Sequence, residues 1–117
     1  MSRDELVRYM VLDWMADDYE NVDQIIFPTV AKVCAEEYGL TIERPEVVSA
    51  LAGLIADGLA KAYLLSGREP FATELQGMPS LDVVEEDFKT YFYPTKKGID
   101  IIQALDDWPW PYDGRTT

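Results

Sequence analysis

The sequence predicts a mainly α-helical fold that carries one β-hairpin, an α+β class. Two observations indicate it: four segments place apolar residues at helical spacing, and two short β-prone runs flank a long connection before the fourth segment. The length of 117 residues, 48% of them hydrophobic, is enough for one buried core without disulfides. We therefore expect residues 1–117 to form a single domain.

The first helix is predicted from Arg3 to about Glu20. Ser2 and Glu5 have the spacing of a capping box, and the segment that follows contains neither glycine nor proline. On a helical wheel its apolar residues cover an arc of roughly 220°, wider than the ~100° stripe that one core contact requires. The arc consists of Leu6, Val7, Met10, Val11, Trp14, Met15 and Tyr19. We expect this helix to bury two sides.

Two further helices are predicted, joined by a short turn. A proline in the first turn and Gly39 at the end delimit the second helix, which spans about Phe27–Tyr38. The third helix starts near Glu43 or Pro45 and stops at Gly58. Its predicted buried face comprises Val47, Val48, Leu51, Leu54 and Ile55.

The hairpin is predicted from the β-prone runs Leu59–Leu65 and Tyr91–Tyr93. The connection between them, about residues 66–90, is long enough to suggest a function or mobility. Thr95 then caps a C-terminal helix of about Lys96–Leu105. The buried stripe of this helix is expected to be Ile99, Ile102 and Leu105.

Two segments resemble winged-helix proteins. Leu51–Leu59 is similar to the end of a recognition helix, where two leucines pack inward and a glycine turns the chain into the first wing strand. Tyr91–Ile99 is similar to the close of the second wing strand in the MarR-like and PadR-like regulators. The resemblance covers most of residues 27–105. It implies a winged helix: three helices, a two-stranded wing with a long connection, and a C-terminal helix.

In that family the outward face of the third helix reads DNA. In this sequence the corresponding face comprises Glu46, Ser49, Ala50, Gly53, Ala56 and Asp57. Base edges are read mostly by Arg, Lys, Asn and Gln, and none of these occurs between Pro45 and Asp57. The face is small and nearly flat, which would suit close packing of another helix or a sheet. The alternative is that its small residues are simply exposed or lie under the hairpin.

The charge balance also disfavours DNA. The chain has 22 acidic and 10 basic residues, a formal net charge of −12, whereas a typical DNA-binding protein neutralises about 6 to 10 phosphates. Nucleic acid, anionic membranes and acidic substrates are therefore unfavourable partners. If DNA were bound, the candidate contacts would be Thr41, Arg44, Lys61, Arg68, Lys96 and Lys97.

The sequence shows no pattern for catalysis or for a cofactor. It has no histidine, no glycine-rich phosphate loop and no calcium-loop pattern, so we expect no enzyme, no cofactor, no metal site and no small-molecule ligand. The single cysteine, Cys34, allows no disulfide within the chain and favours a reducing compartment. Neither a signal peptide nor a membrane span is recognisable, so we expect a cytoplasmic protein.

The predicted tail, about residues 106–117, is extended and carries Trp108 and Trp110 between prolines. Exposed indoles would be costly, so they are expected either to fold back near the first helix or to dock onto another protein. Together with the wide apolar arc, they favour a homodimer through the first helix and the tail. Dimerisation through terminal helices is common in the family.

Three functional hypotheses follow. The favoured one is a non-catalytic winged-helix domain that acts by protein-protein interaction or dimerisation. The second is a DNA-binding transcriptional regulator of the MarR-like or PadR-like type. The third is an acidic DNA mimic or antirepressor, although the carboxylates are dispersed along the chain.

Overall fold

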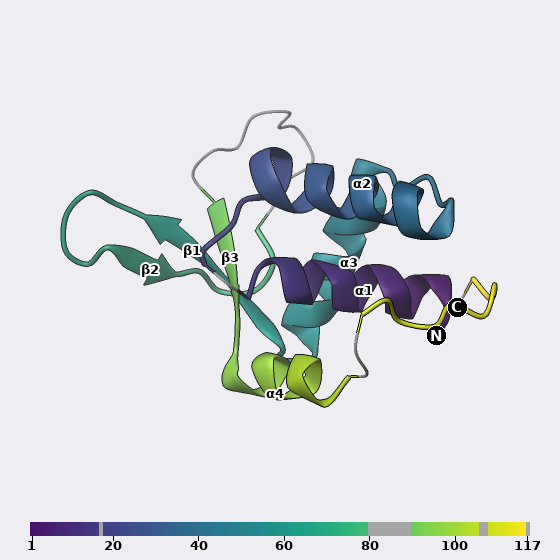
Figure 1. The fold of residues 1–117 in the computed structure, drawn as a ribbon. Coiled ribbons are helices and arrows are strands. Elements are labelled where there is room, and N and C mark those ends of the chain that lie inside the picture. Colours follow the sequence, from purple (N-terminus) through teal and green to yellow (C-terminus); the bar gives the residue numbers. More distant parts are fainter. Residues whose placement is uncertain (17, 80–89, 106–107, 117) are drawn as a thin grey trace.

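The computed structural model of the chain describes residues 1–16, 18–79, 90–105 and 108–116. These residues form a mixed α and β fold with four α-helices and a three-stranded antiparallel sheet (Figure 1). The elements follow in the order α1 (Arg3–Trp14), a π-helical turn η1 (Val22–Ile26), α2 (Phe27–Tyr38), α3 (Arg44–Ala56), β1 (Ala60–Leu65), β2 (Ala72–Glu74), β3 (Thr90–Pro94) and α4 (Lys96–Ala104).

Helix α1 lies at the centre of the helical layer and contacts α2, α3 and α4. The prediction that it buries more than one side is confirmed: although Trp14 stays 38% exposed, six other apolar residues of the segment are at most 1% exposed. They are Leu6, Val7, Met10, Val11 and Leu12, with Met15 just after the helix. The predicted end at Glu20 is wrong. Helix α1 stops at Trp14, and Glu20 instead pairs with Phe92 of β3 through two backbone hydrogen bonds.

Helices α2 and α3 match the prediction closely. Helix α2 has the predicted bounds, and Gly39 ends it in the left-handed conformation with φ of 64°. In α3, Val47, Leu51 and Leu54 are fully buried, whereas Val48 and Ile55 are only half-buried. The core-facing stripe of α3 is therefore narrower than predicted.

The predicted antiparallel pairing of the two β-prone runs is confirmed, with Ala62 of β1 opposite Phe92 of β3. The sheet also contains a strand that was not predicted. Strand β2 lies in the predicted connection and pairs with the other edge of β1, which gives the order β2-β1-β3. Residues 80–89 of that connection lie outside the described residues.

Helix α4 begins where predicted, because the Thr95 hydroxyl accepts a hydrogen bond from the Gly98 amide at 3.2 Å. Its backbone packs tightly on the start of β1: a Cβ at Gly98 would lie 2.2 Å from the Leu59 carbonyl oxygen. The expected stripe on α4 is only half-buried (Ile99, Ile102 and Leu105). No helix among the described residues is long and apolar enough to cross a membrane.

Candidate functional site

The outward face of α3, predicted from the sequence to be small and nearly flat, lies partly beneath α1. The Arg3 guanidinium donates to both Glu46 carboxylate oxygens at 2.8 and 2.9 Å and to the Thr41 carbonyl at 2.7 Å. Further along, Arg8 pairs with Asp57. Ser49, Ala56 and Asp57 remain exposed, whereas Glu46, Ala50 and Gly53 are half-buried. Each of the two expected alternatives thus holds for part of the face: a helix of the same chain, α1, covers some of it, and the rest is exposed.

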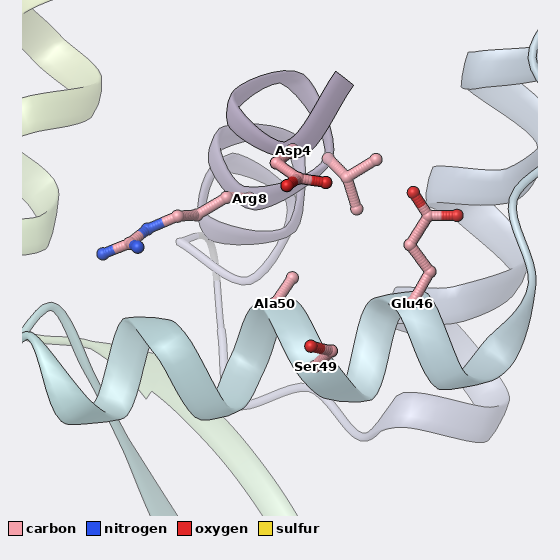
Figure 2. A pocket seen from close by; sticks show the side chains of 6 residues that line it. Asp4, Arg8, Glu46, Ser49 and Ala50 are labelled. Carbon is pink, nitrogen blue, oxygen red and sulfur yellow. The ribbon is translucent and has the colours of Figure 1, made fainter. Parts of the chain in front are cut away.

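Between the two helices is a cavity of about 290 Å³, which we call the α1–α3 hollow. It is lined by Asp4, Val7, Arg8, Glu46, Ser49 and Ala50. Figure 2 shows Asp4 and Arg8 projecting from α1 above α3, with Ala50 pointing up toward them. Hydrogen bonds from Arg8 hold the pKa of Asp57 below its ordinary value, and the bonds to Glu46 raise the pKa of Arg3. Two of the charged residues that line the hollow, Arg8 and Glu46, are therefore already paired within the chain.

Three of the candidate DNA-contacting cations are held by carboxylates of the same chain. Arg44 donates to both oxygens of Asp23 at 2.6 and 3.1 Å. Lys61 lies 2.5 Å from Glu74 across the β1–β2 pair. In α4, Lys96 pairs with Asp100 at 3.0 Å. Phosphate binding would have to compete with each of these ion pairs.

The other candidate contacts are distributed over separate elements. The Lys97 ammonium lies 3.4 Å from the Asp57 carbonyl oxygen, and the Thr41 carbonyl is bonded to Arg3. Arg68 is exposed in the loop of the β1–β2 hairpin. The structure therefore does not bring the six residues together on the face of α3.

The C-terminal tail folds back on its own domain, which is one of the two arrangements predicted for its tryptophans. The Tyr38 hydroxyl donates to the Trp110 carbonyl at 2.6 Å, and Trp110 is only 5% exposed. Backbone hydrogen bonds join the tail to the N-terminus, including one from the Arg3 amide to the Arg115 carbonyl at 2.7 Å. Trp110 and most of the apolar arc of α1 are thus covered within the chain, whereas Trp14 of that arc and Trp108 of the tail stay 38% and 42% exposed.

Trp108 behaves differently from Trp110. It is 42% exposed, and its ring makes edge contacts with Tyr38 and Trp110 at centroid distances of 5.8 and 5.1 Å. It lines a cavity of about 340 Å³ between α1, α2 and the tail, which we call the Trp14–Trp108 groove. The lining residues are Asp13, Trp14, Val33, Glu36, Glu37 and Trp108.

A second apolar surface lies on the β1–β2 hairpin, which extends away from the helices in Figure 1. Leu64, Leu65 and Phe71 are 41%, 38% and 58% exposed. At the base of the hairpin, the ring of Tyr63 packs edge-on against Tyr19 at 5.1 Å. Sequence reasoning missed this surface, although a phenylalanine directly after Pro70 in a polar connection was a usable signal.

Cys34 is fully buried in the core, with its Sγ 3.5 Å from the Sδ of Met10. Burial raises the pKa of the Cys34 thiol to about 11, so the thiolate that nucleophilic chemistry requires is disfavoured near neutral pH. Within the described residues, no group of three or more Cys, Asp or Glu side chains is placed to hold a metal ion.

Comparisons with known proteins give no relative. No protein-family model matches the chain, and no curated protein or solved structure matches it.

Proposed function

We propose that this chain is a non-catalytic winged-helix domain that acts by binding protein, in the first place a second copy of itself, and not by reading DNA. The winged-helix assignment is supported by the order of the elements. Three helices precede an antiparallel pair, β1 and β3, and α4 follows. Strand β2 is an addition to the expected two-stranded wing.

The observation that carries the proposal is the apolar surface of the β1–β2 hairpin. Leu64, Leu65 and Phe71 expose between 38% and 58% of their area on an element that projects from the helical body (Figure 1). Leu65 points to the opposite face of the sheet from its neighbour Leu64, so the hairpin exposes apolar area on both faces, and exposed apolar area of this kind can mark an interaction site. Strand β2 is also an edge of the sheet, and an open edge can pair with a strand of another chain.

Charge favours a second copy at this place. Residues 61–75 carry two basic residues, Lys61 and Arg68, and two acidic residues, Glu69 and Glu74, so the segment is neutral within a chain of net charge −12. Two copies repel each other over most of their surfaces, because both are strongly acidic. The hairpin is a region where association is not opposed by charge and is favoured by apolar burial.

The proposal is tested by the oligomeric state. We expect sedimentation velocity to show a concentration-dependent dimer for the wild type and a monomer for Phe71→Ser. The matched control is Ile25→Ser on η1, because Ile25 is 41% exposed outside the hairpin and its loss should leave the dimer intact. A wild type that stays monomeric at all concentrations would overturn self-association. Tight binding of a DNA duplex at physiological ionic strength would overturn the exclusion of DNA.

A further inference from the structure

We infer that the Trp14–Trp108 groove binds a cationic side chain, above all an arginine, presented by a basic segment of a partner protein. The inference rests on the proposed role in protein binding and adds the chemistry of a partner. It uses a surface separate from the hairpin, since the groove lies between α1, α2 and the tail.

Two partly exposed indoles line the groove. Trp14 and Trp108 line one cavity, and each keeps about two fifths of its surface exposed, at 38% and 42%. The ring of Trp108 is oriented before any ligand binds, because Tyr38 and the buried Trp110 both contact its edge or face. A preoriented indole loses little freedom on binding, and its π face attracts cations more strongly than the other aromatic side chains do.

The groove is acidic as well as aromatic. Asp13, Glu36 and Glu37 also line the groove, and no basic side chain is among the described residues that do so. Within the described part of the chain, Glu36 and Glu37 form no ion pair, although Lys32 lies one helical turn before Glu36. The groove thus combines aromatic surface with the charges of Glu36 and Glu37, which no described basic side chain compensates.

The combination of indoles and carboxylates determines which kind of ligand the groove favours. An apolar helix would bury the carboxylates without a partner, which is costly, and an anion would be repelled. An arginine can stack its planar guanidinium on an indole while its N–H groups donate to a carboxylate, which an ammonium does less well. A cavity of about 340 Å³ has room for one such side chain with part of its backbone. A basic peptide segment is therefore the partner chemistry that the groove fits.

The probe is a peptide of alternating arginine and glycine, compared with the same peptide in which every arginine is replaced by the uncharged isostere citrulline. We expect the arginine peptide to shift the indole N–H resonances of Trp14 and Trp108, and the citrulline peptide to leave them unchanged. The double variant Glu36→Gln and Glu37→Gln should weaken binding about tenfold, consistent with charge-assisted contacts. The control with the same change in net charge is Glu43→Gln with Glu69→Gln, since both residues are exposed outside the groove.

Each outcome decides the inference. Absence of binding overturns it, and so does an equal loss of affinity in the two double variants, because that would indicate attraction to net charge alone. Shifts of the Trp14 and Trp108 resonances that depend on protein concentration without peptide would also overturn it, since a second copy would then occupy the groove. Phe71→Ser separates the two proposals: it should abolish the dimer and leave peptide binding within about twofold of the wild type.

Discussion

The two cavities along α1 have similar volumes, 290 and 340 Å³, but opposite electrostatic arrangements. At the α1–α3 hollow, two lining residues are paired between the helices, Glu46 with Arg3 and Arg8 with Asp57, and Asp4 is the remaining charged lining residue. In the Trp14–Trp108 groove, carboxylates lie beside two indoles, and no described lining residue is basic. The first arrangement stabilises the fold, whereas the second is suited to a cation from another molecule.

This difference shows that the net charge of −12 is not spread evenly over the surface. Most described cations are used inside the chain, as Arg3, Arg8 and Arg44 are, each with a carboxylate distant in sequence. Such pairs leave other carboxylates uncompensated. Glu36 and Glu37 of the Trp14–Trp108 groove are two of the carboxylates that carry this excess negative charge.

The largest expected effect on stability is that of replacing Trp110 by alanine, which removes the side chain that supports Trp108 in the groove. Trp110 is 5% exposed and contacts Trp108, so its truncation should destabilise the protein by about 3 to 5 kcal/mol. Urea denaturation measures this. Trp108→Ala is the comparison, and it should cost about 1 kcal/mol because the ring is already 42% exposed. Equal losses for the two variants would show that the tail does not depend on Trp110.

Reversing one charge in each cavity tests whether the carboxylates of the α1–α3 hollow contribute more to stability than those of the Trp14–Trp108 groove. Glu46→Lys removes two hydrogen bonds with Arg3 and places two cations together, which should destabilise by about 1 to 2 kcal/mol. Glu37→Lys puts a cation into the groove and should change the unfolding free energy by less than about 0.5 kcal/mol. Both variants change net charge equally. A larger loss for Glu37→Lys would contradict the comparison.

Local signals made much of the fold predictable. Gly39 ends α2 in the left-handed conformation, and the Thr95 side chain caps the first turn of α4. Both roles depend only on residues close in sequence, so the end of α2 and the start of α4 were predictable. The end of α1 was not found, because Tyr19 continues the helical pattern but packs against Tyr63 and Tyr93 of the sheet. Strand β2 has only three residues, and its pairing with β1 leaves no periodic signal.

The candidate sites were harder to predict, for a physical reason. The ion pair of Arg3 and Glu46 joins residues 43 positions apart, and neither helix alone reveals it. The Trp14–Trp108 groove likewise requires α1, α2 and the tail to meet. Trp108 was singled out from the sequence, but its separation from the buried Trp110 depends on how the tail crosses Tyr38.

A smaller effect is expected from Gly53→Ala in α3, which tests how closely α1 covers this helix. A Cβ at Gly53 would lie 3.5 Å from an Arg8 guanidinium nitrogen, an ordinary contact. The change should stabilise the protein by about 0.5 to 1 kcal/mol, because alanine is the better residue in a helix interior. Thermal unfolding measures it. A destabilised variant would show that Arg8 packs on α3 without room for a methyl group.

The smallest effect is the acid dependence that Arg8 confers through Asp57. Its hydrogen bonds lower the folded-state pKa of Asp57 below the ordinary value of 3.8. A lowered pKa contributes stability that is present above 3.8 and is lost as the pH falls through the folded-state value. Arg8→Met should therefore lose less stability than the wild type between pH 5 and about pH 3, measured by denaturant midpoints. Self-repulsion of the other carboxylates is relieved in both proteins alike, so a difference between the two slopes isolates this ion pair, and parallel slopes would show that it contributes nothing in solution.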